Sequence, residues 1–421
     1  MLSQNILNFV DTAMVSRLGD AALAAVGTGG FINFMAIALV TGLSAGVQAV
    51  AARRKGEGRD NETAIPLNGA MVIAVTFGIP MSLILFACAS PLFALVNSDP
   101  QVLAEGSPYL KVRLIAMVAV GLNFSFRGYW NGIHLPKLYL FTLVAMHSLN
   151  IFLNWVLIFG HLGAPAMGTT GAGLATTIAT CLGSCMYIGL GFAFARGSGF
   201  LHGLPSRETM KTILRLSVPN GVQQLFFAAG FTMLFKILGL VGTSTTAAAN
   251  VLINVMLIAI LPGIALGIAA ASLVGSALGR GDVADARRWG WDVVKVAVVL
   301  LFLLGLPMLL APDAIFYLFE LSPQTQDLAR LPLRIVGGTI CIDGVGLVLQ
   351  HALLGAGASR STMVISIVMQ WVVFLPFAYL VGPVLGYGLL GIWLAQIGYR
   401  LIQAGIFTRK WMGNSWTEIR V

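Results

Sequence analysis

The chain has 421 residues, of which 57% are hydrophobic and only 10% are charged. These values exclude an ordinary soluble domain, whose charged share is about 25%, and they predict an all-α integral membrane protein that crosses the bilayer many times. The net charge of +9 does not indicate nucleic-acid binding, because the basic residues lie in short connectors between apolar runs and form no continuous stripe.

Twelve apolar segments long enough to be helices follow one another along the chain. The predicted spans are residues 1–16, 23–52, 63–88, 108–130, 136–160, 167–195, 212–240, 245–279, 286–311, 328–355, 360–384 and 386–408. Several exceed the roughly 20 residues that cross a bilayer, which implies tilting or extension into water. The first is short, since about 15 residues rise only about 22 Å. We therefore expect the printed sequence to begin inside a truncated first helix.

The basic residues of the connectors orient the predicted spans. When the N-terminus and every second connector are placed on the cytoplasmic side, 18 of the 25 Lys and Arg residues lie on that side. Cytoplasmic connectors of membrane proteins carry such an excess of positive charge. The sequence thus predicts a multi-pass protein of a bacterial-type plasma (inner) membrane with both termini in the cytoplasm.

Glycines repeat in the two halves of the chain at a period of about 225 residues. The matching pairs are Gly42 with Gly267, Gly56 with Gly281, and Gly132 with Gly357. Six spans per half is an even number, so both halves enter the membrane in the same sense, related by a pseudo-two-fold axis along the membrane normal. We expect an N-lobe at 1–195, a cytoplasmic linker at 196–211 and a C-lobe at 212–421. Two six-helix lobes around a cleft are typical of an alternating-access transporter.

Four stretches resemble the multidrug and toxic compound extrusion (MATE) family. They are residues 9–19 (FVDTAMVSRLG), 150–175 (NIFLNWVLIFGHLGAPAMGTTGAGLA), 248–254 (AANVLIN) and 341–357 (CIDGVGLVLQHALLGAG), the last resembling the tenth helix of the NorM-like branch. The resemblance implies an antiporter, functional as a monomer, that exports organic cations, drugs or other amphipathic compounds by alternating access. Inward flow of H⁺ or Na⁺ drives such export, and no cofactor is implied.

Enzyme motifs are missing from the sequence. It contains no GxxxxGK[ST] phosphate loop and no HExxH pattern. Its four cysteines, at positions 88, 181, 185 and 341, lie in apolar stretches without CxxC spacing, so they predict neither disulfides nor a metal site. We expect a transporter rather than an enzyme, with Na⁺ at Asp11 or Asp343 as the one candidate metal site.

Asp11 and Asp343 are the two acidic residues that lie deep inside apolar segments. A charged carboxylate at the centre of a membrane helix costs roughly 2.5 to 3.5 kcal/mol, which marks both as functional candidates. Asp11 shares a helical face with Gln4 and Asn8, and it could exchange a proton or bind Na⁺ as the cleft opens and closes. The resemblance makes it the coupling residue of the N-lobe. The alternative is that Asp11 lies near a helix end, where its carboxylate accepts hydrogen bonds from water or from a loop.

Asn150 and Asn154 are four positions apart on the fifth predicted helix, so their amides lie one above the other. The resemblance adds Thr176 as the hydroxyl that completes a polar cluster with them. DinF-like members carry an aspartate where Asn154 stands, and its absence leaves Asp11 as the only N-lobe acid. Ordinary hydrogen bonding between helices is the alternative for these three residues.

Asp343 lies near the middle of the tenth predicted helix. NorM-like proteins pair the matching aspartate with a glutamate on the seventh helix, but residues 217–240 here contain no acid. A single carboxylate favours a proton over Na⁺ at this site. The alternative is a structural aspartate that bonds to an asparagine or glutamine. The further polar candidates for the cavity are Gln223, Gln224, Asn250, Asn254 and His351, the histidine being a possible proton relay.

Two other functions stay open at this stage. One is a lipid-linked oligosaccharide flippase of the same superfamily, which needs cationic side chains in the cavity to meet a pyrophosphate. The predicted spans offer little besides Lys236 and Lys295 for that purpose. The other is a passive channel, which the sequence disfavours because it supplies no rings of polar groups around a pore.

Overall fold

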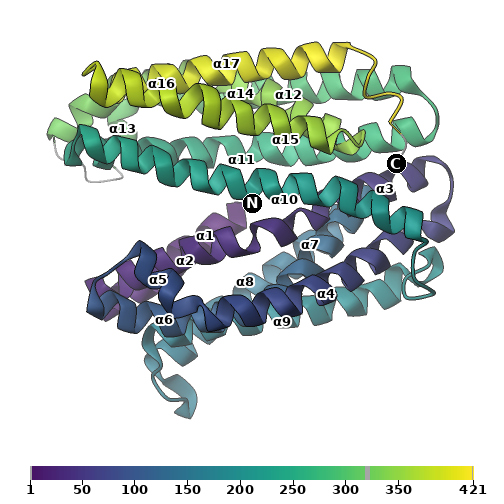
Figure 1. The fold of residues 1–421 in the computed structure, drawn as a ribbon, viewed down its shortest axis with the longest axis horizontal. Helices are drawn as coiled ribbons and strands as arrows, with labels where there is room; N and C mark the ends of the chain where they lie inside the picture. The colour runs from purple at the N-terminus through teal and green to yellow at the C-terminus, as the bar shows by residue number, and fades with distance from the viewer. Residues whose placement is uncertain (1, 318–322, 420) are drawn as a thin grey trace. The chain divides into compact units, whose positions relative to one another are not determined.

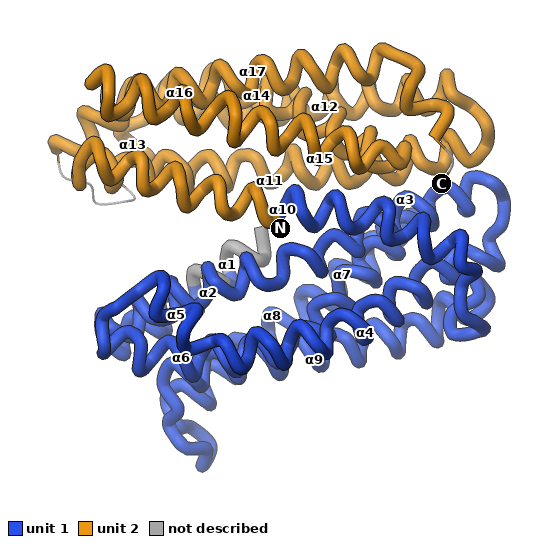
Figure 2. Tube along the Cα trace, viewed as in Figure 1, with its two compact units in different colours: residues 1–224 blue, residues 225–421 orange. Residues whose placement is uncertain are grey.

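The computed structural model describes residues 2–317, 323–419 and 421, and the side chains of residues 2–6, 8 and 9 lie outside the described part. Every regular element in this part is a helix, which confirms the all-α prediction. Two compact units make up the chain, residues 1–224 and residues 225–421 (Figure 2). Each unit is described separately below.

Unit 1 holds nine α-helices in its described residues, the beginning of a tenth, and four single-turn 3-10 helices in its connectors (Figure 1). The α-helices are α1 (Leu2–Val15), α2 (Asp20–Thr41), α3 (Leu43–Gly56), α4 (Ile65–Ala87), α5 (Ala89–Val96), α6 (Pro100–Ile115), α7 (Met117–Gly132), α8 (Pro136–Phe159), α9 (Gly168–Phe194) and the first part of α10 (Arg207–Val241). α8 packs against both α1 and α9. This packing brings together the three helices that carry the predicted site residues Asp11, Asn150, Asn154 and Thr176.

Unit 2 contains the rest of α10 and the helices that follow it in the chain (Figure 1). Its elements are α11 (Thr243–Gly279), α12 (Val283–Leu310), α13 (Pro312–Tyr317), α14 (Pro323–Gly355), α15 (Ser359–Ile367), the π-helical η5 (Val368–Phe374), α16 (Leu375–Tyr379), the π-helical η6 (Leu380–Val384) and α17 (Gly388–Met412). α14 packs against α11, α12 and α17, so it lies at the centre of the unit.

The predicted spans correspond to these helices. Within the described residues, ten helices or helix runs are long and apolar enough to cross a membrane, or eleven when the bent pair α6 and α7 counts as one span. The remaining predicted segment is α1, which is helical but only 14 residues long. α2 and α3 form one 37-residue span, and α6 and α7 meet at a bend of 51°. The fourth predicted span, 108–130, starts too late, because α6 begins at Pro100.

The connector between α9 and α10 is fixed to unit 1 by one buried asparagine of α4. Asn68 Nδ2 donates hydrogen bonds to the carbonyl oxygens of Gly199 (2.9 Å) and Gly203 (3.0 Å). The Asn68 Oδ1 accepts from the backbone N–H of Leu201 at 3.0 Å. Buried side-chain amides satisfied on both sides give a loop a defined conformation. The connector is therefore part of the folded unit.

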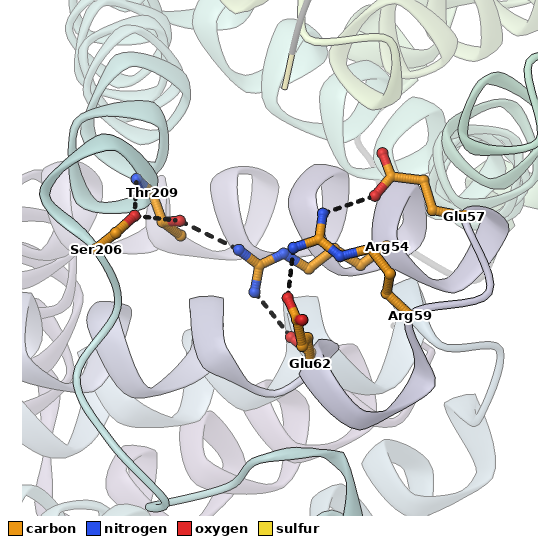
Figure 3. A network of polar contacts seen from close by, with 6 residues as sticks. All are labelled: Arg54, Glu57, Arg59, Glu62, Ser206 and Thr209. Atoms are coloured by element: carbon orange, nitrogen blue, oxygen red, sulfur yellow. Dashed lines mark hydrogen bonds and ion pairs between the residues drawn. The ribbon is translucent and has the colours of Figure 1, made fainter.

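A second set of contacts joins the start of α10 to the α3–α4 turn (Figure 3). Arg54 is buried, and its guanidinium donates to the Glu62 carbonyl oxygen (2.8 Å) and to Thr209 Oγ1 (3.1 Å). Arg59 beside it forms ion pairs with Glu57 and Glu62. The first turn of α10 is thus held at the same end of unit 1 as the connector.

The first part of α10 also packs closely on the junction of α2 and α3. A Cβ atom at Gly42 would lie 2.3 Å from the Ser217 carbonyl oxygen, and one at Gly221 would lie 2.5 Å from the Leu39 carbonyl oxygen. Only glycine allows two backbones to approach so closely. Hence α10 enters unit 1 as one of its packed helices.

The second part of α10 belongs to unit 2, because the unit boundary falls between Gln224 and Leu225 inside the helix. The Trp371 Nε1 of η5 donates to the Phe226 carbonyl oxygen at 3.1 Å, and the two rings meet edge to face. Gln370 Nε2 donates to the Phe227 carbonyl oxygen at 3.3 Å. One uninterrupted helix therefore has its two ends packed in different units.

Candidate functional site

In unit 1, four predicted site residues from three helices lie within hydrogen-bonding distance of one another. Asn154 Nδ2 of α8 donates to Asp11 Oδ1 of α1 at 2.6 Å and to Asn150 Oδ1 at 3.1 Å. Asn150 Nδ2 donates to Thr176 Oγ1 of α9 at 3.0 Å. We call Asp11, Asn150, Asn154 and Thr176 the unit 1 cluster. It exists because α8 places its two asparagines one turn apart between α1 and α9.

The Asn150 amide has a second orientation that fits the cluster. In it the Asn150 nitrogen donates to Asp11 Oδ1 at 3.1 Å, and its oxygen accepts from Thr176 Oγ1 at 3.0 Å. The amide oxygen and nitrogen are assigned from the hydrogen-bond network. This orientation gives the carboxylate two amide donors, one from each asparagine.

The cluster also offers oxygen atoms to a small cation. Asn150 and Asn154 are each only 1% exposed, and the buried Asn154 Oδ1 accepts no hydrogen bond from the described residues. A buried acceptor without a donor costs free energy, which a cation or a protonated group beside it would recover. Within the described part of the chain, no Lys or Arg nitrogen lies within 4 Å of the Asp11 carboxylate. Carboxylate, amide and hydroxyl oxygens are the ligands that hard cations prefer.

Gln4 and Asn8, the other candidates of the first helix, have side chains that lie outside the described residues.

In unit 2, Asp343 of α14 faces an arginine that the sequence did not indicate as its partner. Arg400 Nε of α17 lies 3.6 Å from Asp343 Oδ1, and the two side chains are only 19% and 12% exposed. Neither of these two atoms makes a hydrogen bond to the described residues. A signal for Arg400 was available, because it is the basic residue inside the last predicted span that the charge count assigns to neither side.

Two small cavities lie beside this pair. Asp343 and Arg400 line both of them, the first together with Thr339, Trp393 and Gln396. The first has a free volume of ≈ 20 Å³ and the second ≈ 10 Å³, so the first has room for about one water molecule. A drug-sized molecule needs a pocket of about 300 to 1,000 Å³. These spaces within unit 2 suit an ion or a water molecule.

Two further buried polar atoms without a hydrogen-bond partner in the described residues belong to residues that line the first cavity, Gln396 Oε1 and Trp393 Nε1. Gln396 Nε2 donates to Met256 Sδ at 3.5 Å, while Gln396 Oε1 accepts nothing from the described residues. Gln350 and Gln403 line the second cavity. Glutamine side chains therefore line both of the cavities that the ion pair borders.

The asparagines that the sequence offered as partners of Asp343 bond to each other instead. Asn254 Nδ2 donates to Asn250 Oδ1 at 3.0 Å and to the Asn250 carbonyl oxygen at 2.9 Å, and both residues are exposed in the described structure. Gln223 and Gln224 lie in the part of α10 that belongs to unit 1, where Gln224 is exposed. Within the described residues of unit 2, Asn250 and Asn254 are therefore partners of each other.

The ring of His351 packs against Gly267 of α11. Its Nδ1 lies 2.8 Å from the Leu347 carbonyl oxygen, and a Cβ atom at Gly267 of α11 would meet its ring at 2.8 Å. Gln350 takes the place beside Asp343 instead. At about 100° per residue, position i+7 returns to within about 20° of the starting face, whereas i+8 is about 80° away.

The cations considered for a flippase cavity also have defined places. Lys295 Nζ forms an ion pair with Asp292 at 2.9 Å, and both side chains are exposed. Lys236 is exposed on α10. Arg400, whose side chain is 19% exposed, is a cation of unit 2 that the sequence did not mark as a site residue, and its charge faces Asp343.

Comparisons with known proteins agree with the helical arrangement. The family model described as MatE matches residues 1–156 and 219–380. A "Probable multidrug resistance protein NorM" of Thermotoga maritima is 23% identical over 421 residues, covering 99% of this chain and 90% of that protein. A protein of the same description from Burkholderia pseudomallei is 29% identical over 417 residues, covering 93% and 85%.

Solved structures share the fold of the whole chain. An outward-facing multidrug resistance MATE family transporter of the MOP superfamily has a TM-score of 0.90 at 22% identity, covering 100% of this chain and 94% of that chain. A MOP superfamily transporter from Pyrococcus furiosus has a TM-score of 0.88 at 23% identity, with coverages of 98% and 92%.

Proposed function

This chain belongs to the MatE family of multidrug efflux transporters, and we propose that it is an antiporter that exports organic cations, drugs or other amphipathic compounds in exchange for inward-moving H⁺ or Na⁺. It is a multi-pass membrane transporter and not an enzyme. Its bacterial relatives imply the inner membrane. Both termini lie in the cytoplasm in this proposal, as the distribution of Lys and Arg favours.

The observation that carries the proposal is the unit 1 cluster. Asp11 supplies a carboxylate with no ion pair in the described residues, and Asn154 supplies a buried amide oxygen beside it. A proton or Na⁺ that binds there neutralises the carboxylate and changes its hydrogen bond to α8. Because α1 contacts α8 through this bond, occupancy of the site alters how α1 is held. A cation can drive a conformational change only if it binds one conformation more tightly than the other.

The energy available from one cation is sufficient for export. A monovalent cation that moves inward gains about 2.3 kcal/mol per 100 mV of membrane potential. At about 1.4 kcal/mol per factor of ten, this supports a roughly 50-fold gradient of an uncharged substrate exchanged for one cation. Alternating access of the two lobes, 1–195 and 212–421, is the mechanism we propose for this exchange.

A flippase for lipid-linked oligosaccharides is the less favoured function. It would need cations free to meet a pyrophosphate. Lys295 pairs with Asp292, and Arg400 pairs with Asp343. Lys236, the remaining candidate, is exposed on α10 and is not among the described residues that line the cavities of unit 2, where the lining cation, Arg400, faces Asp343.

Ethidium efflux from membrane vesicles tests the proposal. Efflux is measured with an imposed pH gradient or an imposed Na⁺ gradient, for the parent and for Asp11→Asn. Asparagine keeps the size of the side chain but cannot bind a proton or carry a negative charge. We expect at least about a tenfold loss of gradient-driven efflux, corresponding to roughly 1.4 kcal/mol or more.

Asp20→Asn is the matched control, since Asp20 is an exposed aspartate at the start of α2. It should leave efflux unchanged. If Asp11→Asn accumulates normally and exports ethidium with the parent's dependence on the gradient, coupling at the unit 1 cluster is wrong.

A further inference from the structure

The carboxylate of unit 2 differs from that of unit 1 in having a cation already beside it. Arg400 Nε lies 3.6 Å from Asp343 Oδ1, whereas the described residues place no cationic nitrogen within 4 Å of Asp11. Both members of the unit 2 pair are largely withdrawn from solvent. The electrostatic attraction between opposite charges grows as water is excluded. Asp11 and Asp343 are thus aspartates in two different electrostatic environments.

Arg400 is held in this position by its surroundings. Its Cζ lies 5.2 Å from the centre of the Tyr399 ring, within the range of a cation–π contact. Tyr399 is buried and stacks on Phe374 with ring centres 4.6 Å apart. The guanidinium also remains protonated at any physiological pH, unlike a desolvated lysine. Asp343 therefore faces a positive charge that is both fixed in place and permanent.

We propose that Arg400 acts as a tethered cation that occupies the Asp343 site, and that it thereby determines ion selectivity by excluding Na⁺ from unit 2. A free Na⁺ ion must lose water and translational freedom to bind, whereas the guanidinium is covalently attached next to the carboxylate. This inference rests on the proposed cation coupling, because it leaves the unit 1 cluster as the site where the driving ion binds.

The surroundings of the pair also define what would bind if the tethered charge were removed. Gln396 Oε1 is buried and accepts no hydrogen bond from the described residues, and Thr339 lines the same cavity. With the Asp343 carboxylate they form a set of oxygen ligands suited to a hard monovalent cation. The cavity volume of ≈ 20 Å³ excludes anything much larger than an ion or a water molecule. Neutralising Arg400 should therefore create a Na⁺ site.

The experiment measures binding of radioactive Na⁺ to the purified full-length protein at pH 8.5. All variants carry Asp11→Asn, so that binding at the unit 1 cluster does not contribute and a failure of the proposed coupling there cannot affect the result. We expect no specific Na⁺ binding with Arg400 intact and about one ion per chain with Arg400→Gln. Adding Asp343→Asn to Arg400→Gln should abolish this binding.

Arg400→Lys is the matched control, because the Asp343 carboxylate beside it favours the charged ammonium, and it should bind no Na⁺. The fluorescence of Trp393, which lines the cavity, should change with Na⁺ only in the variant that binds it. Two results would overturn the proposal: Asp343-dependent Na⁺ binding while Arg400 is intact, or no specific binding by a folded Arg400→Gln protein.

A second measurement covers the case in which Arg400→Gln does not accumulate, since removing one partner of a buried ion pair is strongly destabilising. Melting temperatures are compared for Asp343→Asn, Arg400→Gln, Arg400→Met and the double variant Asp343→Asn/Arg400→Gln. A true pair predicts that the double variant is more stable than either single variant. Strictly additive losses would show that Arg400 is not the partner of Asp343 and would overturn the proposal.

Discussion

Asp11 and Asp343 show how the environment of a residue decides its chemistry. Asp11 accepts a hydrogen bond from the buried amide of Asn154, and Asp343 faces the guanidinium of Arg400. Amide donors hold a carboxylate in position without neutralising it, whereas an arginine supplies a full opposite charge. At the scale of single residues, the first arrangement leaves room for an exchangeable cation and the second does not.

Asn154→Leu tests the support that the cluster gives to Asp11. Leucine has a similar volume but removes the donor to the carboxylate, and a hydrogen bond to a charged group contributes about 1.5 to 3 kcal/mol. We expect the initial rate of gradient-driven ethidium efflux to fall roughly 10- to 150-fold. The rate is measured in vesicles over a series of imposed gradients.

The control is Asn123→Leu, which removes comparable contacts elsewhere in unit 1. Asn123 Nδ2 donates to the Thr180 carbonyl oxygen, and its Oδ1 accepts from Ser184 Oγ. Loss of these bonds lowers stability but should leave the dependence on the gradient intact. Equal effects of both variants on that dependence would contradict a special role of Asn154.

The sequence predicted the unit 1 cluster better than the surroundings of Asp343. Asn150 and Asn154 lie on one helix four positions apart, so their spacing alone indicates a shared face. Arg400 and Asp343 lie on different helices, and one sequence carries no signal of which helices pack together. For Gln350 the signal was present in the sequence, since position i+7 lies closer to the helical face of Asp343 than position i+8, which His351 occupies.

At the scale of helices, glycines set how closely neighbouring helices can pack. A Cβ atom at Gly355 of α14 would lie 2.1 Å from the Ala271 carbonyl oxygen of α11, whereas one at Gly338 of the same helix would meet nothing within 4 Å. Both glycines lie within the α14 helix. Gly355 therefore lies where the backbones of α14 and α11 touch, whereas Gly338 lies in open space.

Gly355→Ala should therefore destabilise the protein, because the two helices must move apart. Overpacking of this kind typically costs about 1 to 3 kcal/mol. Gly338→Ala is the matched substitution and should be neutral or stabilising, since alanine favours a helix by about 0.5 to 1 kcal/mol over glycine. Melting temperatures of the purified variants give the comparison. A Gly355→Ala protein as stable as Gly338→Ala would show that α11 and α14 tolerate a wider spacing.

Most spans could be predicted because a helix that crosses a membrane needs a long run of apolar residues, and such runs are visible in the sequence. The interruption between α2 and α3 at Gly42 was not predicted, and neither was the close packing of α10 against that residue. The start of α6 could have been found from sequence: Asp99 caps the helix by accepting from Gln101 N and Val102 N, and Pro100 occupies the first turn. This pattern is a known helix-start signal.

At the scale of the whole molecule, the connector between α9 and α10 is more ordered than its composition indicates. Residues 196–211 are polar, which predicted a linker between lobes. The structure folds the connector onto unit 1 through Asn68, about 130 residues earlier in the chain. The sequence could not show this, because an isolated asparagine within an apolar span gives no indication of its partner.

Asn68→Leu should release the connector. Trypsin cleaves after Arg and Lys, and Arg196, Arg207 and Lys211 lie in or next to this segment. Cleavage of a native protein requires local opening, so losing the Asn68 hydrogen bonds should speed it by about tenfold, or roughly 1.4 kcal/mol. Asn97→Leu, in the connector between α5 and α6, is the control and should leave the cleavage rate here unchanged. An unchanged rate in Asn68→Leu would mean that other contacts alone hold the connector.

The continuity of α10 across the unit boundary bears on how such a chain can change during evolution. Residues 207–224 complete unit 1, and residues 225–241 complete unit 2. A recombination point in the polar connector before Arg207 would separate unit 1 from a helix segment that packs against Gly42 and Leu39. A point at the unit boundary would cut a helix in two. Exchange of either unit with that of a relative would thus disrupt the packing of α10, and we expect the two units to be inherited together.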